Sequence, residues 1–155
     1  MRRKRKYKKT HEPDVQYNDI AVSRFINYLM KGGKKSTAEK VLYKTFENIQ
    51  KETKAEPFGL FQKAIENASP LLEVVSKRVG GANYQVPREV RPERKFFLAC
   101  KWIIVAARAR KGKPMADKLA EEIIAASKNE GTAIKKRQNI HRMAEANRAF
   151  AHFAR

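Results

Sequence analysis

The chain has 155 residues, with 35 Lys and Arg against 16 Asp and Glu, so its formal net charge is +19 at pH 7 and a polyanionic partner is favoured. Its length and its 42% hydrophobic content fit one domain with one buried core. The single cysteine, Cys100, excludes an internal disulfide and a cysteine zinc cluster, and the sequence contains neither a membrane span nor a signal peptide, so we expect a cytoplasmic protein without a membrane partner.

A basic N-terminal arm is predicted over residues 1–19. It contains almost no apolar side chain that could dock on a core, so we expect it to be disordered until it meets a partner. Its cations are Arg2, Arg3, Lys4, Arg5, Lys6, Lys8 and Lys9. The remaining residues, 20–155, are predicted to form the helical domain.

Three helices are predicted before residue 70, because apolar side chains recur there at helical spacing. The first runs from Ile20 to the Gly32-Gly33 breaker, the second starts at a capping box formed by Ser36 and Glu39, and the third runs from Pro57 to Pro70. A β-hairpin follows at about residues 72–90, where the apolar repeat changes to two and a glycine pair marks a turn over residues 80–83.

Tyr84, next to this turn, has two interpretations. Its ring could stack on a nucleobase, or it could pack across the hairpin against Val79. Spacing alone does not distinguish them.

Three more helices are predicted after the hairpin. The first begins at Pro92 and is apolar over most of its circumference, as expected for a central helix buried on several sides. The next begins at Pro114 and stops at residues 129–131, and Thr132 is expected to cap the last one. The predicted fold is therefore all-α: a single domain of about six helices, one protruding β-hairpin between helices three and four, and a disordered basic arm.

Catalytic and metal-binding groups are not predicted. Cys100 stands among apolar neighbours and is expected to be a core residue. His11, His141 and His152 lack the spacing and the carboxylates of a metal site, and no glycine-rich nucleotide loop is present. We therefore expect a protein that is not an enzyme and uses no cofactor, metal or small-molecule substrate.

The basic residues indicate nucleic acid as the partner. They occur in the arm, in the hairpin, in the loop at residues 108–113 and in the last helix with the Lys34-Lys35 turn. One such cluster is usually a solvated surface, but a net charge of +19 weakens that interpretation. A DNA-binding regulator is the rival, since the short helices between residues 37 and 68 could mimic a helix-turn-helix; a protruding hairpin favours irregular RNA instead. An RNA-modifying enzyme is the least favoured class.

Four motifs occur in order along nearly the whole chain: RFIN at residues 24–27, GKKSTAEK at 33–40, VGGANYQVP at 79–87 and RMAEANRAFAHF at 142–153. Together they resemble bacterial-type small-subunit ribosomal protein seven. The resemblance implies a six-helix domain with a long β-ribbon that binds the 3′ major domain of small-subunit rRNA and nucleates assembly of the subunit head. It also allows a secondary role as translational repressor of its own message.

The same resemblance assigns residues and partners. The implied rRNA contacts are the seven arm cations together with Lys34, Lys35, Lys77, Arg78, Arg88, Arg91 and Lys113. The residues implied to lie near exit-site tRNA are Gly80, Gly81, Asn83, Tyr84, Arg142 and Arg148. Small-subunit ribosomal protein eleven and other head proteins are expected neighbours, in a cytoplasmic or an organellar ribosome.

Overall fold

The computed structural model describes residues 11–154, so the predicted arm cations, Arg2 to Lys9, lie outside the described residues. The chain forms two compact units, one that ends at Lys40 and one that begins at Val41. Helix α2 (Lys35–Thr53) begins in the first unit and continues into the second. The predicted domain boundary between residues 19 and 20 stays a prediction.

In the first unit, α1 (Ile20–Leu29) presents a buried stripe that includes Phe25 and Ile26. The Asp19 carboxylate caps this helix by accepting from the backbone N–H of Ala21 at 2.6 Å and of Val22 at 3.0 Å. The predicted capping box is wrong: α2 begins one residue before Ser36. Glu39 instead forms an ion pair with Lys35 across one helical turn, at 3.7 Å.

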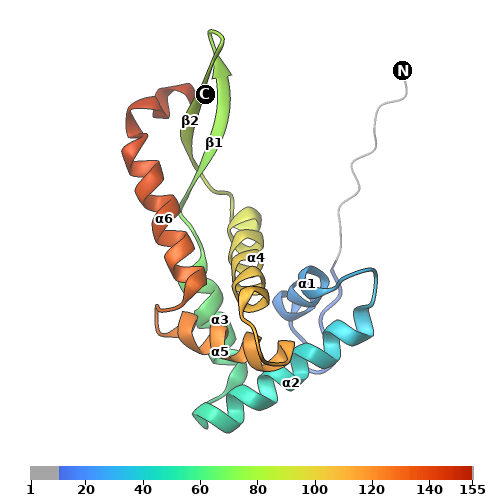
Figure 1. Ribbon diagram of the computed structural model, residues 1–155. Coiled ribbons are helices and arrows are strands. Elements are labelled where there is room, and N and C mark those ends of the chain that lie inside the picture. Colours follow the sequence, from blue (N-terminus) through green and yellow to red (C-terminus); the bar gives the residue numbers. More distant parts are fainter. Residues whose placement is uncertain (1–10, 155) are drawn as a thin grey trace, which may run out of the picture. The chain divides into compact units, whose positions relative to one another are not determined.

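The second unit packs its helices around a shared core (Figure 1). They are the remainder of α2, α3 (Pro57–Ala68), α4 (Pro92–Ala109), α5 (Met115–Ser127) and α6 (Thr132–Ala146). Helix α5 lies against both α3 and α4, and α6 lies against α4. Cys100 is fully buried on α4, as predicted, but Val105 on the same helix is 53% exposed. The predicted burial of α4 therefore holds for only part of its circumference.

A buried carboxylate joins α5 to the start of α6. The Glu122 side chain is fully buried and accepts from an Arg110 guanidinium nitrogen at 2.6 Å and from the Ala133 backbone N–H at 2.9 Å. This carboxylate, rather than the predicted Thr132 cap, satisfies the helix N-terminus, because Thr132 is already the first helical residue. Gly131 is needed here: its φ is +93°, and a Cβ would stand 2.9 Å from the Glu122 Oε1 atom.

The predicted hairpin is present as an antiparallel two-stranded ribbon of β1 (Leu72–Val79) and β2 (Ala82–Glu89). Gly80 and Gly81 both have positive φ, 57° and 89°, as a two-residue type I′ turn requires. The turn is thus shorter than predicted, and Asn83 pairs with Arg78 inside the ladder. Eight-residue strands extend ~26 Å at 3.3 Å per residue.

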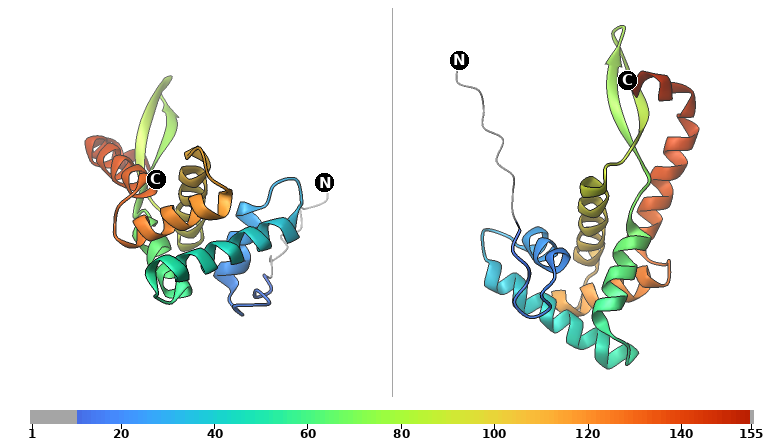
Figure 2. Two further views of the ribbon diagram at one scale, coloured as in Figure 1. Left: turned by 60° about the horizontal axis from the view of Figure 1, so that its bottom comes forward. Right: turned by 180° about the vertical axis from the view of Figure 1, so that it is seen from behind.

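The last described segment lies on this ribbon. After α6, a 3₁₀ segment, η1 (Arg148–Ala154), turns back and contacts β2 (Figures 1 and 2). The fold class is confirmed: the described residues are mostly helical, with one hairpin between α3 and α4. None of their helices is both long and apolar enough to cross a membrane.

Candidate nucleic-acid interface

The base of the ribbon is built around Glu73. Its buried carboxylate accepts from Arg88 on the facing strand at 2.7 Å and from Arg94 on α4 at 3.3 Å. Burial alone would raise the pKa of Glu73, but the hydrogen bonds and charges of the two arginines outweigh it and hold the pKa below its ordinary value. The Arg88 side chain is still 58% exposed, so it is oriented by the protein and open to a partner.

Farther along the ribbon, the C-terminal segment holds the two residues that face each other in the ladder, Lys77 and Tyr84. The Lys77 ammonium donates to the Phe153 carbonyl at 2.6 Å. The half-buried Tyr84 ring lies 5.2 Å from the ring centre of Phe150 and 5.3 Å from that of Phe153. Tyr84 therefore has a third set of neighbours that neither sequence interpretation included.

The tip of the ribbon is open. Gly80, Gly81 and Asn83 are exposed, and a Cβ at either glycine would meet nothing within 4 Å. Arg78 is also exposed and forms no ion pair or hydrogen bond with any side chain in the described part of the chain. The two glycines leave room for a sugar-phosphate chain to approach the tip closely, and Arg78 offers it a cation that no carboxylate of the described residues neutralises.

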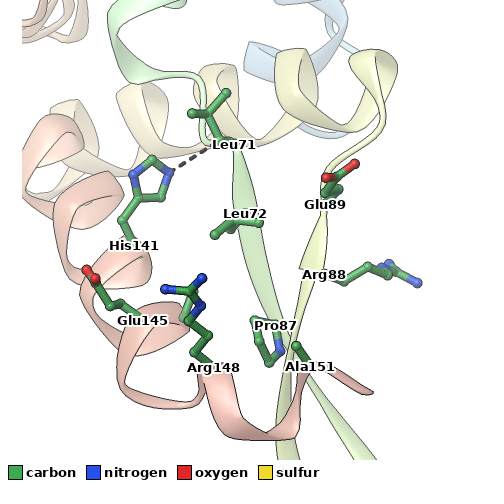
Figure 3. A pocket seen from close by; sticks show the side chains of 10 residues that line it. Leu71, Leu72, Pro87, Arg88, Glu89, His141, Glu145, Arg148 and Ala151 are labelled. Carbon is green, nitrogen blue, oxygen red and sulfur yellow. Dashed lines mark hydrogen bonds between the residues drawn. The ribbon is translucent and has the colours of Figure 1, made fainter. Parts of the chain in front are cut away.

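A groove of about 590 Å³ separates α6 from the base of the ribbon (Figure 3). Its floor includes Leu72 and Pro87, and the Nε2 atom of His141 accepts from the Leu71 backbone N–H at 3.1 Å across one end. Burial, with a smaller contribution from the charge of Arg137, lowers the pKa of His141. His141 is therefore neutral and acts here as an acceptor.

Charges of both signs line this groove. Arg148 of the C-terminal segment lies beside Glu145 on the α6 side of the groove, and Glu89 lies on the ribbon side (Figure 3). The Arg88 side chain points away from α6, toward the Glu73 side of the ribbon. Arg142 is exposed on α6.

The predicted rRNA contacts fall into separate places. Arg91 precedes α4 next to the ribbon, whereas Lys113 follows the opposite end of that 18-residue helix, about 27 Å away at 1.5 Å per residue. Lys113 pairs with Glu121, which raises the pKa of the lysine. Lys34 and Lys35 are exposed in the first unit. The structure thus groups the ribbon residues with Arg148, and Lys113 is not among them.

Sequence reasoning missed two sets of residues. Arg94 was not considered, although a cation at the start of α4 follows the second strand closely in the chain. No role was predicted for Phe150 and Phe153 of the RMAEANRAFAHF motif, although their spacing of three residues could have indicated a shared face. No cluster of His, Cys, Asp or Glu that could hold a metal is found within residues 11–154.

Comparisons with known proteins agree with one another. A family model described as ribosomal protein S7p/S5e matches residues 1–148. A Thermotoga petrophila protein named small ribosomal subunit protein uS7 is 56% identical over 153 residues, which cover 99% of each chain. Proteins of the same name from Thermotoga maritima and Rickettsia bellii are 54% and 55% identical; the first match covers 99% of each chain, and the second covers 92% of this chain and 87% of the relative.

Proposed function

Because the chain belongs to the ribosomal protein S7p/S5e family, we propose that it binds the 3′ major domain of small-subunit rRNA and nucleates assembly of the subunit head. Membership makes it a structural, non-enzymatic component of the small ribosomal subunit, with rRNA as its partner. The proposed RNA-binding surface is the two-stranded ribbon with its cations.

The observation that supports this surface is the fixed orientation of two ribbon cations, Lys77 and Arg88. A two-stranded ribbon alone is marginally stable in water, but this one is held by η1 at Tyr84 and by Arg94 at its base. Lys77 and Arg88 are therefore ordered before RNA arrives, which reduces the conformational entropy lost on binding. A rigid ribbon can recognise the shape of an RNA junction, whereas a flexible charged tail can supply only nonspecific attraction.

We propose further that the ribbon tip and the C-terminal segment face exit-site tRNA. The tip glycines allow close approach of a sugar-phosphate backbone, and Arg148 brings a cation from η1 to the same ribbon. The mixed charges of the groove in Figure 3 suit a protein neighbour better than RNA, and small-subunit ribosomal protein eleven or another head protein is the proposed occupant. Repression of its own message would use the same RNA-binding surface.

The test is a salt series of binding to three ligands: the 3′ major domain, a scrambled RNA of equal length and a duplex DNA. The rRNA domain should bind far tighter at every salt concentration, because shape recognition survives when counterion release is weakened. If the affinities for the three ligands follow the same dependence on salt concentration, the protein is a generic polyanion binder and the proposal is wrong.

A pair of triple variants locates the surface. Replacing Lys77, Arg78 and Arg88 by Ala should lower specific affinity roughly 100-fold and reduce the salt slope by about 2. The control replaces three exposed lysines by Ala: Lys44 and Lys51 on α2, and Lys54 directly after it. It removes the same amount of charge. Equal losses in the two variants would show that net charge alone matters.

A further inference from the structure

Helix α4 carries an apolar strip that the fold leaves partly uncovered. Trp102, Val105, Ala106 and Ala109 follow one another at helical spacing and so share one side of the helix. Val105 is 53% exposed, Trp102 is half-buried and Ala106 is buried. An exposed apolar strip of this kind marks a contact surface more often than an ordinary solvated helix face.

This strip forms the floor of a groove of about 460 Å³ between α4 and the start of α6. The polar residues that line the groove are Lys101 on one side and Thr132 and Lys136 on the other. No carboxylate lines it among the described residues, in contrast to the groove of Figure 3 with Glu89 and Glu145. Its chemistry is apolar and aromatic inside, with cations at the rim.

The donors of this groove are available to a ligand. Lys136 has no ion-pair partner in the described part of the chain, and the Lys101 ammonium contacts only the Phe97 ring, 5.7 Å from its centre. The Trp102 indole N–H likewise has no acceptor within residues 11–154. An aromatic face with a neighbouring donor and two flanking cations matches the parts of one nucleotide: a flat base and charged phosphates.

We infer that this groove binds an unpaired nucleobase of RNA, with the base against Trp102 and Val105 and the adjoining phosphates on Lys101 and Lys136. The inference rests on the proposed function, since it adds a second RNA contact on α4 to the ribbon. It differs in kind from the ribbon contacts, because stacking is insensitive to charge and should persist at high salt.

Trp102 is the only tryptophan of the chain, so its fluorescence reports on this groove directly. The full chain is titrated with a single-stranded oligoadenylate and with an abasic ribose-phosphate oligomer of equal length and charge. Oligoadenylate should quench Trp102 and bind about tenfold tighter than the abasic oligomer. Unchanged fluorescence, or equal affinities, would overturn the inference, and a protein segment would then be the better candidate occupant.

Two matched surface variants assign the effect to the groove. Val105→Glu places a carboxylate in it, and Met143→Glu makes the same charge change on α6 at a side chain of similar exposure, 47% against 53%. Val105→Glu should abolish the preference for the base-bearing oligomer, and Met143→Glu should retain it. Lys101→Ala with Lys136→Ala should weaken both oligomers, and the melting temperature of each variant confirms folding.

Binding to the 3′ major domain is measured in parallel and separates the two proposals. If the domain binds specifically but Val105→Glu and Met143→Glu behave alike, the groove is overturned and the proposed function stands. If the domain binds no better than scrambled RNA, the proposed function fails, and the fluorescence titration alone decides whether the groove accepts a base.

Discussion

Two carboxylates in the second unit, Glu122 and Glu73, each hold an arginine, but they differ in how far the ion pair is exposed to water. Glu122 is fully enclosed, and its oxygens are taken by Arg110 and by the N-terminus of α6. Glu73 keeps 12% of its side chain exposed, and its partners Arg88 and Arg94 are more than half exposed. The first site joins helices; the second orients cations at a surface.

The difference shows how one interaction serves stability in one place and recognition in another. In the enclosed site the carboxylate cannot be lost without leaving Arg110 with Glu121 alone and the N-terminus of α6 without its acceptor, so Glu122 should matter to the whole unit. At the ribbon base, water or a phosphate can replace the carboxylate as the acceptor for Arg88 and Arg94, so Glu73 should matter to the orientation of Arg88 more than to folding.

Removal of the enclosed carboxylate should have the largest effect on stability. Glu122→Ala removes the closer of the two carboxylates that hold Arg110 and leaves the Ala133 N–H without an acceptor, and should lower the free energy of unfolding by about 2–3 kcal/mol. Urea unfolding followed by circular dichroism measures it. The neighbouring Glu121→Ala, whose side chain is 29% exposed, should lower it by about 1 kcal/mol or less. If both variants lose a similar free energy of unfolding, the burial of Glu122 adds nothing to stability.

The ribbon offers an intermediate effect that is local. Tyr84→Ala removes two ring contacts to η1, each worth about 0.5–1.5 kcal/mol beyond buried area. Global unfolding should change little, but amide hydrogen exchange in β1 and β2 should accelerate, because the ribbon then loses its support. Tyr84→Phe keeps the ring and serves as control.

A double-mutant cycle with Phe150→Ala tests the same contact. If Tyr84 and Phe150 support each other, the effects of the two alanines on ribbon exchange are not additive. Strict additivity would show that Tyr84 and Phe150 stabilise the ribbon independently of each other.

Local patterns predicted most of the helices and the ribbon. The apolar repeats of α1 and α3, the Gly131 stop and the change to period two at Leu72 depend on nearest neighbours in the chain, which a sequence displays directly. The partly uncovered side of α4 could not be predicted in this way, because an apolar helix face does not tell what covers it.

Interactions between distant residues account for the errors and omissions. Thr132 is a residue type that often caps helices, but the Ala133 N–H donates instead to Glu122, 11 residues before Ala133 in the chain. The amine of Lys77 and the carbonyl of Phe153 are 76 residues apart, and no local pattern joins them. The sequence therefore identified the ribbon cations as candidates, whereas their orientation depends on the tertiary fold.

The smallest effect should come from His141, which tests whether the groove of Figure 3 senses pH. Its pKa in the folded chain lies below its ordinary value of 6.5, mainly through burial, so the unfolded chain binds more protons as pH falls through 6.5. Stability should therefore be complete above 6.5, decline as pH falls toward the folded-state pKa, and level off below it.

Protonation also removes the acceptor for the Leu71 N–H, a partly exposed hydrogen bond worth about 0.5 kcal/mol. The measurement is the difference in unfolding free energy between the wild type and His141→Gln, whose amide oxygen can accept but does not titrate. This difference should shift against the wild type as pH falls from 6.5 toward 4.5, the ordinary pKa of Glu73, below which both proteins begin to lose the stability that this carboxylate contributes. A difference that does not change with pH would mean that His141 keeps its ordinary pKa and that the Leu71 bond does not couple the ribbon to α6.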